Sequence, residues 1–174
     1  MENDTTHVGS SVTSDFQFFN YKIDKFVFKM KPQIKNLLIS TTEMDNWRFG
    51  VKIHNPKYFK KNQVFIAGLD FNMIYVDPKT IDLKKEEQDF DISIQTSISG
   101  CFKEIGNAFT QVQILDLAKC QTSAILFPFL RSAITSYFGL AGFGSFVMPL
   151  MNFVEIAKDQ KDLSIEEIDE EIIS

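Results

Sequence analysis

Four segments of the chain alternate between hydrophobic and polar residues, which is the pattern of a strand that buries one of its faces. The clearest is WRFGVKIH, where Trp47, Phe49, Val51 and Ile53 share one side and the charged residues share the other. The segments VFIAGLDFNMIYV and DFDISIQTSIS alternate in the same way farther along the chain. The loops between the segments are compatible with hairpins, so the pattern predicts an antiparallel sheet with one covered face.

The first of the four segments, FQFFNYKIDKFVFKM, changes its phase midway. Three apolar residues before Asp24 have odd numbers, and three after Lys25 have even numbers. They are Phe19, Tyr21 and Ile23 in the first half, and Phe26, Phe28 and Met30 in the second half. A one-residue shift of this kind predicts a β-bulge within a single long strand.

A long helix is predicted to cover this sheet. Thr110 and Gln113 have the spacing of a capping box, and the run QVQILDLAKCQTSAILFPFLRSAITSYFGL then places apolar residues at helical spacing. Gly139 or Gly142 is expected to end the helix. Pro128 lies inside the run, where a proline costs about 3 kcal/mol. Burial of the large apolar side chains around it contributes roughly 15 kcal/mol gross, so we expect the helix to continue through the proline with a kink.

A second helix is predicted to begin within PLMNFVEIAK. The acidic end, SIEEIDEEIIS, has a second capping-box pair at Ser164 and Glu167 and fits either a third short helix or a solvated tail. Strands followed by helices indicate an α+β domain. We therefore expect a disordered polar segment at residues 1–15, one domain at residues 16–160, and the acidic tail or short helix at residues 161–174.

Composition narrows the class of protein. The 174 residues include 18 Phe beside one Trp and four Tyr, so the core of one domain is easily filled and aromatic surface can be left for a partner. The net charge is −5 with no basic stripe, which argues against nucleic-acid binding. Cys101 and Cys120 lack a metal-binding or redox spacing and are expected to be free thiols in a reducing compartment. The N-terminus lacks the apolar stretch of a signal peptide, so a cytoplasmic location is expected.

One stretch raises the question of a membrane span. No charged residue lies between Arg131 and Glu155, which is long enough to cross a bilayer. The stretch is interrupted by GLAGFGS and by Pro149. We interpret it as a helix end, a glycine loop and the start of a second helix, and we expect no membrane insertion.

Residues suited to catalysis are sparse. His7 and His54 have no Ser, Cys or carboxylate partner at a recognisable spacing. The loop GLAGFG follows a helix rather than a strand, which does not fit a dinucleotide site. EEIDEE lacks the turn glycine of a calcium loop. We therefore predict no enzyme, no cofactor and no metal site.

Several motifs resemble, in the same order, those of the SecB family of protein-export chaperones. ILFPFLR, at residues 125–131, is similar to the family's helix signature I-L-F-P-Y-A-R. LAKC, SGCF and PLMNF are similar to its A-H-C, G-G-I-F and P-V-N-F segments, and WRFGVKI is similar to W-x-x-x-V-K-L in its second strand. The resemblance extends from about Phe18 to Lys158.

This resemblance implies a four-stranded antiparallel Greek-key sheet, covered by a long kinked helix and a shorter C-terminal helix, in a dimer of dimers. It also implies an ATP-independent holdase that captures unfolded or nascent polypeptides, either preproteins or an antitoxin, in apolar grooves. Position by position, it assigns client binding to Trp47, Val51, Ile53 and Phe153. It assigns core and oligomer contacts to Ile125, Leu126, Phe127, Pro128 and Phe129.

Two departures from the family pattern affect the expected partners. Lys25 and Lys29 stand near the positions where the family has acidic residues that dock the motor SecA. Only QTSA separates Cys120 from Ile125, which is shorter than in the family. The resemblance therefore does not extend to SecA binding, and it fits the dedicated chaperones of antitoxins at least as well.

Two alternatives stay open from the sequence. Alternation alone places Trp47, Val51 and Ile53 in the core of the sheet, and a residue can belong both to the core and to a groove. A chain with this fold could also be an oligomeric structural or interaction module that does not bind clients. Exposed apolar surface and suppression of aggregation distinguish a holdase from such a module.

Overall fold

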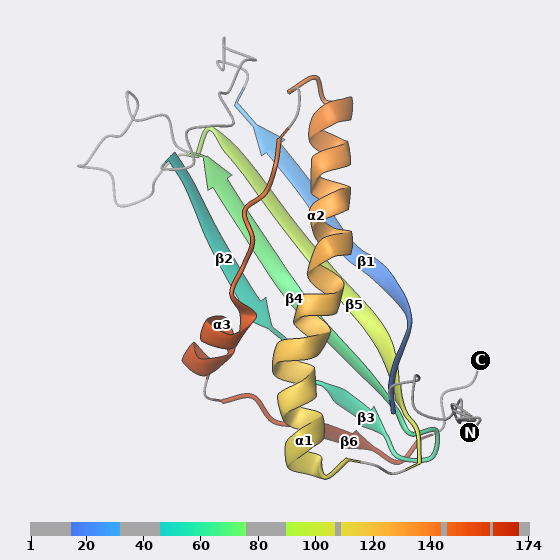
Figure 1. Ribbon diagram of the computed structural model, residues 1–174. Helices are drawn as coiled ribbons and strands as arrows, with labels where there is room; N and C mark the ends of the chain where they lie inside the picture. Colours follow the sequence, from blue (N-terminus) through green and yellow to red (C-terminus); the bar gives the residue numbers. More distant parts are fainter. Residues whose placement is uncertain are drawn as a thin grey trace, which may run out of the picture.

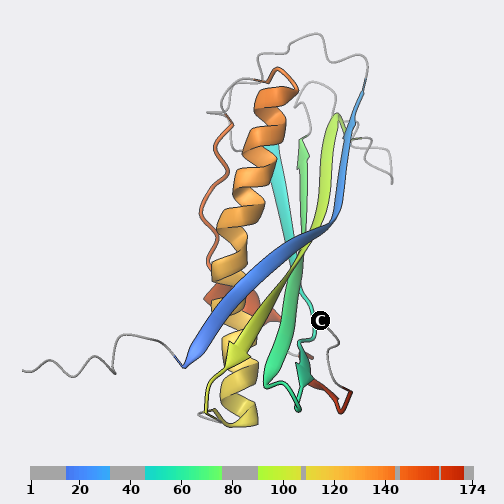
Figure 2. The same cartoon turned by 90° about the vertical axis from the view of Figure 1, so that its right-hand side faces the viewer.

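The computed structural model of the protein describes residues 15–31, 46–75, 90–106, 109–143, 146–160 and 162–170. Residues 1–14, where the disordered segment is expected, lie outside these ranges. Within them the chain forms two layers, a twisted sheet and a helical layer on one of its faces (Figure 1, Figure 2). The predicted mixed α+β class is therefore confirmed.

In the described part of the chain the sheet has six strands rather than the expected four. The long strands are the predicted ones: β1 (Phe16–Met30), β2 (Trp47–Ile53), β4 (Val64–Tyr75) and β5 (Ile92–Glu104). Two strands of three residues, β3 (Lys57–Phe59) and β6 (Glu166–Ile168), complete the sheet. Segments this short carry no readable alternation, which is why the sequence pattern does not reveal them.

The strand order is β1-β5-β4-β3-β6, and β2 also pairs with β4. β1 pairs with β5 rather than with β2, which follows it in the chain, so the long strands form a Greek key. β2 pairs with residues 69–75 of β4 and β3 with residues 64–66, so both lie on the same edge of β4. β6 runs parallel to β3, and neither of the two alternatives for the acidic end included this strand.

One helical run crosses the covered face of the sheet (Figure 2). It begins as α1 (Gln111–Asp116), passes through a π-helical turn (Leu117–Gln121) and continues as α2 (Thr122–Leu140). The predicted capping box is present, because the Gln113 N–H donates to the Thr110 hydroxyl and the Thr110 N–H donates to the Gln113 side chain. The run ends at Gly142, whose φ of 84° lets the Phe143 N–H donate to the Phe138 carbonyl.

The long helix packs on the sheet through one face. Pro128 lies on the opposite, exposed face, and α2 continues through it as predicted. The departure from α-helical geometry falls upstream, in the π-helical turn, where the Thr122 hydroxyl donates to the Ala118 carbonyl. The α2 side chains that are fully buried against the strands are Leu126, Leu130, Ile134 and Phe138.

β1 contains the predicted bulge, a register shift between Ile23 and Lys25. A second shift, between Phe18 and Asn20, was not predicted. The two shifts keep aromatic residues of both halves of the strand on the helical side of the sheet. The resulting ring contacts are those of Phe18 and Tyr21 with Phe129, and those of Phe26 and Phe28 with Tyr137.

After α2 the chain returns along the covered face of the sheet. Residues 146–152 run over the sheet without regular structure, and Phe146 and Met148 are buried there (Figure 1). α3 (Phe153–Asp159) then begins at Asn152, whose side chain accepts a hydrogen bond from the Glu155 N–H. None of the helices in the described ranges combines the length and the hydropathy needed to cross a membrane.

Both cysteines are free thiols, as expected. Cys101 lies on β5 and Cys120 in the π-helical turn, and both are half-buried. Burial raises the pKa of the Cys101 thiol, which keeps it protonated and weakly reactive near neutral pH.

Candidate functional site

Trp47, the first residue to which client binding is assigned, is part of the core. It is 3% exposed, and its ring packs against those of Tyr75, Phe138 and Phe146 with centroids 5.1, 6.1 and 5.2 Å away. Its indole N–H is buried without a hydrogen-bond partner among the described residues. This position agrees with alternation, which places Trp47 on the covered face of β2, and the assignment of client binding to Trp47 stays a prediction.

The other three assigned residues gather around α3. Ile53 and Phe153 are buried, and Val51 is half-buried against the core. Phe153 lines a cleft at the beginning of α3, and Val51 and Ile53 line a cleft at the end of α3. The structure brings these three together in one region and leaves Trp47 outside it.

The first cleft, of about 510 Å³, lies between the beginning of α2 and α3. Its walls are mostly apolar, and they include Cys120, Ala124 and residues 150–154. Pro128 has no N–H, so the carbonyl of Ala124 lacks the donor that a helix ordinarily provides four residues later.

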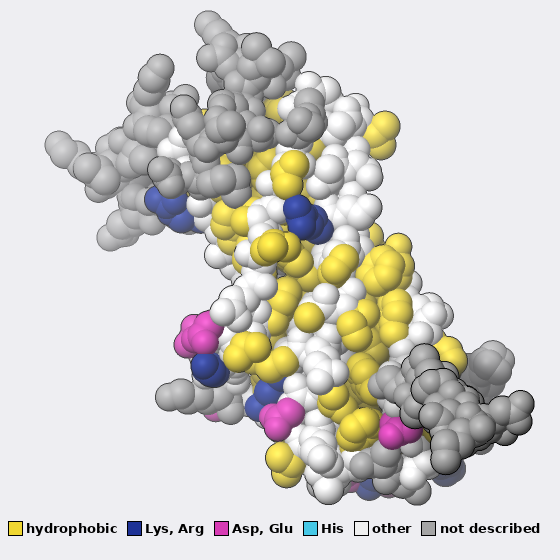
Figure 3. All heavy atoms as spheres, viewed as in Figure 1, with side chains coloured by type: hydrophobic (Ala, Val, Ile, Leu, Met, Phe, Trp, Pro, Cys, Tyr) yellow, Lys and Arg dark blue, Asp and Glu magenta, His cyan; other side chains and the backbone are white. Residues whose placement is uncertain are grey.

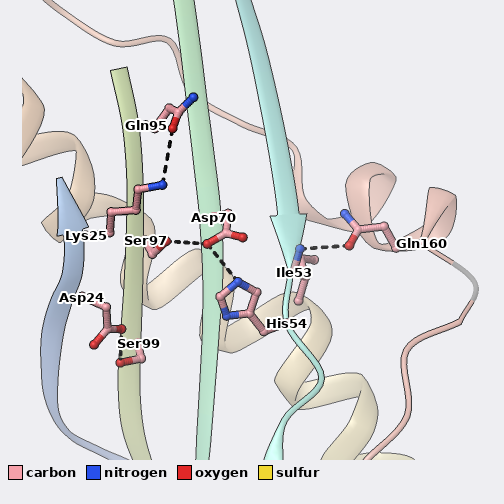
Figure 4. A network of polar contacts seen from close by, with 9 residues as sticks. All are labelled: Asp24, Lys25, Ile53, His54, Asp70, Gln95, Ser97, Ser99 and Gln160. Carbon is pink, nitrogen blue, oxygen red and sulfur yellow. Dashed lines mark hydrogen bonds and ion pairs between the residues drawn. The ribbon is translucent and has the colours of Figure 1, made fainter. Parts of the chain in front are cut away.

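The second cleft, of about 640 Å³, lies between β2 and the residues that follow α3. Gln160 forms its most specific contact, because the side-chain amide bonds the backbone of the outer edge of β2. The Ile53 N–H donates to Gln160 Oε1 at 2.9 Å (Figure 4), and Gln160 Nε2 donates to the Val51 carbonyl at 3.2 Å. The carboxamide therefore occupies the position that a neighbouring strand would take.

A third cleft, of about 590 Å³, lies between α1 and the segment leading to β6. It is lined by Val112 and Leu115 of α1 and by residues 163–165 and 167. Leu163 also lines the second cleft, so the two clefts adjoin. The first two clefts are lined by residues of α3, and the third is lined by residues that follow it.

Two exposed apolar side chains, Leu150 and Val154, line the first cleft, and a third, Val147, precedes them in the chain. Leu150 is 83% exposed, and Val147 and Val154 on either side of it are more than half exposed. Hydrophobic side chains extend over much of this face of the molecule (Figure 3). Sequence reasoning missed these three residues, although the absence of charge between Arg131 and Glu155 was the signal that could have found them.

The residues of the ILFPF signature divide between core and surface. Leu126 and Phe127 are buried, Ile125 and Phe129 are half-buried, and Pro128 is exposed. The ring of Phe129 stacks on that of Tyr21 with centroids 4.3 Å apart, which ties α2 to β1. The role of these residues in oligomer contacts stays a prediction.

The other face of the sheet is polar. Asp70 accepts a hydrogen bond from the Ser97 hydroxyl at 2.5 Å and lies 3.0 Å from Nε2 of His54 (Figure 4). Partial burial raises the pKa of Asp70, but the hydrogen bonds from Ser97 and His54 and the charges of His54 and Lys52 outweigh it, so the pKa is lowered. The Ser97 hydroxyl donates to Asp70 and not to His54, so this arrangement does not activate a serine nucleophile.

A Greek-key sheet covered on one face by a long helix and a shorter C-terminal helix is a SecB-like fold, and comparison with solved structures supports this class. The SecB-like chaperone Rv1957 of Mycobacterium tuberculosis, in complex with a ChAD peptide from the Rv1956 HigA1 antitoxin, matches with a TM-score of 0.54. The two sequences are 8% identical, and the match covers 78% of this chain and 90% of that chain. The likeness therefore lies in the fold alone.

A protein of unknown function from Streptococcus agalactiae matches with a TM-score of 0.39 and 11% identity, over 78% of this chain and 97% of that chain. No protein-family model and no curated protein sequence matches the chain.

Proposed function

We propose that the protein is an ATP-independent holdase that captures unfolded polypeptide segments in the clefts beside α3, above all in the mostly apolar first cleft. The observation that supports this most is Leu150, which is 83% exposed at the rim of the first cleft between two other exposed apolar residues. Exposed apolar side chains beside a mostly apolar cleft mark a place where a partner binds. The SecB-like fold, and the antitoxin peptide bound by the Mycobacterium tuberculosis chaperone of similar fold, support the same role.

The clefts suit clients of many sequences. Recognition there depends mainly on apolar burial rather than on matched hydrogen bonds, so it tolerates different side chains. Burying Val147, Leu150 and Val154 contributes about 1.5–3 kcal/mol gross for each residue, and the cost of ordering the client offsets much of that gain. One segment therefore binds weakly, and tight capture requires several such surfaces on one particle. For this reason we also propose the dimer of dimers.

The client class that we favour is an antitoxin rather than an exported preprotein. We also propose that the protein acts in the cytoplasm. Lys25 and Lys29 are both exposed on β1, where an acidic docking surface for SecA is expected in an export chaperone. Nζ of Lys25 also donates to Oε1 of Gln95 at 3.4 Å, on the polar face of the sheet. A basic surface at this place does not favour the export motor.

Suppression of aggregation tests the holdase. The aggregation of a chemically unfolded enzyme is followed by light scattering with the wild type and with Leu150→Ser/Val154→Ser. We expect the double variant to need about tenfold more protein for the same suppression, because each tenfold step corresponds to about 1.4 kcal/mol of lost binding free energy.

Leu140→Ser is the matched control, because Leu140 is 88% exposed but lies at the end of α2 and lines none of the three clefts. Equal loss in the control, or no suppression by the wild type, would contradict the proposal.

An oligomeric structural module is the alternative function, and one observation favours it. Phe19 and Tyr21 are exposed on β1, which is an edge strand of the sheet in the described part of the chain. Exposed aromatic residues on an edge strand suit an interface between copies of a chain. An oligomer by light scattering, combined with no suppression of aggregation at any concentration, would support this alternative.

A further inference from the structure

The outer edge of β2 and β3 is followed by residues from the C-terminal part of the chain. Gln160 bonds the backbone of β2 at Val51 and Ile53. Farther along the edge, the Ser164 N–H donates to Oδ1 of Asn55 at 3.2 Å. We call Gln160 together with residues 162–168 the C-terminal strip.

The strip continues along β3 as a paired strand. The Glu166 N–H donates to the Pro56 carbonyl at 2.9 Å, and the Lys60 N–H donates to the Ile168 carbonyl at 3.3 Å. Between these bonds, β6 lies in parallel register with β3. The strip therefore covers the outer sheet edge from Val51 to Lys60.

The C-terminal strip is held to the sheet edge by few backbone hydrogen bonds for its length. On β2 a side-chain amide replaces a backbone strand, and on β3 the ladder is three residues long. Lys57 pairs with Glu166 at 3.8 Å, and Lys60 pairs with Glu167 and with Asp169, all on exposed side chains. Exposed ion pairs stabilise little and are screened by salt. Such an occupant can leave the edge while the rest of the sheet stays folded.

We propose that the outer edge of β2 and β3 is the docking edge for an extended client peptide, and that the C-terminal strip is an internal competitor for it. This inference rests on the proposed function and adds the mode of binding and its regulation. An extended peptide that pairs with an open edge gains backbone hydrogen bonds that do not depend on its sequence. Displacing Gln160 also frees Val51 and Ile53 beside the second cleft.

The strip indicates which peptides the edge accepts. Its sequence from residue 163, LSIEEIDE, places apolar residues around a pair of acids. Glu166 and Glu167 face Lys57 and Lys60, while Ile165 packs against the core beside the third cleft. A client segment that combines apolar residues with one or two acids at this spacing therefore fits the edge in two ways. Its acids pair with Lys57 and Lys60, and its apolar side chains enter the neighbouring clefts.

A reversible lock on the strip tests the proposal. Lys57 and Glu166 are Cα partners in the ladder with side chains on the same side, so Lys57→Cys/Glu166→Cys can form a disulfide across neighbouring strands. Cys101 and Cys120 are replaced by Ala in every variant. The oxidised and reduced forms are the same chain, so a folding defect weakens peptide binding in both forms. A difference in binding between them therefore reports the cross-link.

The probe is the fluorescently labelled peptide LSIEEIDE, and its binding is measured by fluorescence anisotropy. We expect oxidation to weaken binding by about tenfold or more, since the apparent affinity falls with the fraction of open edge. Reduction should restore it. Unchanged affinity on oxidation would overturn the proposal.

Matched controls separate the lock from other effects. Lys57→Ser/Glu166→Ser removes the same charges without a cross-link and should not respond to oxidation. The peptide LSIPEIDE should bind more weakly than LSIEEIDE, because its proline removes the N–H that corresponds to the Glu166 donor to the Pro56 carbonyl. LSIKKIDE should also bind more weakly, because it places positive charge against Lys57 and Lys60. Equal binding of all three peptides would contradict pairing at this edge.

The aggregation assay, repeated on the oxidised and reduced forms, distinguishes this proposal from the proposed function. If the wild type suppresses aggregation, and the oxidised and reduced forms of the lock variant suppress it equally, the docking edge is overturned and the holdase stays in place. Peptide binding that responds to the lock, without any suppression of aggregation, would support the docking edge and overturn the holdase.

Discussion

Phe127 of α2 and Phe153, the first residue of α3, meet edge to face with their ring centroids 5.2 Å apart. Phe127 also contacts the ring of Phe71 on β4 at 6.0 Å, so a chain of aromatic contacts joins α3 to the sheet. The first cleft lies at the beginning of α3 and the second at its end. The position of α3, and with it the shape of both clefts, therefore depends on this contact.

Replacing Phe153 should weaken both folding and client capture. Phe153→Ala removes a buried ring and should lower the free energy of unfolding by about 3–5 kcal/mol. It should also reduce suppression of aggregation at temperatures where the variant stays folded, because α3 loses its anchor. Denaturant unfolding and light scattering check the two effects. Phe153→Leu is the milder control, and a variant that loses stability but keeps full suppression would contradict the importance of α3.

The burial of Trp47 predicts a different outcome for that residue. Trp47→Ala should lower the free energy of unfolding by about 3–5 kcal/mol, with little change in capture by the protein that remains folded. Trp47→Phe keeps an aromatic ring in the site and removes the indole N–H that has no partner among the described residues. It should therefore cost less than the alanine variant. If Trp47→Ala unfolds like the wild type and captures clients poorly, Trp47 belongs to the client site after all.

α2 packs closely on the sheet at Gly100 of β5. A Cβ built on Gly100 would lie 2.6 Å from Cδ2 of Leu126 and 3.0 Å from Cε2 of Phe102. Gly100→Ala should therefore lower the free energy of unfolding by about 1–3 kcal/mol through overpacking, measured by urea denaturation. Gly50→Ala is the control, because its Cβ would meet only Cβ of Asn72, at 3.9 Å. Equal effects at the two glycines would contradict the close packing of α2.

Tyr58 should make the free energy of unfolding depend on pH in the alkaline range. Its hydroxyl donates to Oε2 of Glu104, a carboxylate that is 1% exposed and also accepts from the Phe109 N–H. Burial, together with the hydrogen bond and charge of Glu104 and the charge of Glu167, raises the pKa of Tyr58 to about 12. An unfolded tyrosine titrates at about 10. The stabilisation is therefore fully present below pH 10 and is lost as the pH rises toward 12.

Tyr58→Phe tests this dependence. Below pH 10 the variant should have a free energy of unfolding about 1–3 kcal/mol lower than the wild type, because a buried carboxylate loses a donor. The difference should shrink when both proteins are unfolded by urea at about pH 11. In Glu104→Gln, ultraviolet titration should show the pKa of Tyr58 moving back toward 10. A difference between wild type and Tyr58→Phe that is constant with pH would contradict the assigned bond.

The long elements could be predicted from the sequence because each carries its own pattern. The bulge at Asp24 and the capping box at Thr110 are local features, and local sequence is sufficient to indicate them. β3 and β6 could not be found in this way, since three residues show no period and their pairing joins distant parts of the chain. The bond of Gln160 to β2 spans 107 residues in sequence and has no local signal either.

The candidate site was predicted only in part. Alternation indicated a buried Trp47, while the family resemblance indicated a groove, and the packing of Trp47 with Phe138 and Phe146 agrees with alternation. The resemblance did lead to Phe153, which lines the first cleft. Leu150 was not found from the sequence. Residues 146–152 have no regular structure, so only their path over the sheet decides which of their apolar side chains face solvent.

β6 follows every other described element in chain order, so it is synthesised after them. Until it has been made, a growing chain exposes the backbone of β3 without its last neighbour. Two copies translated close together would then present unfinished edges to each other. The order of synthesis thus makes premature pairing between neighbouring nascent chains a hazard at β3 that lasts until β6 pairs with it.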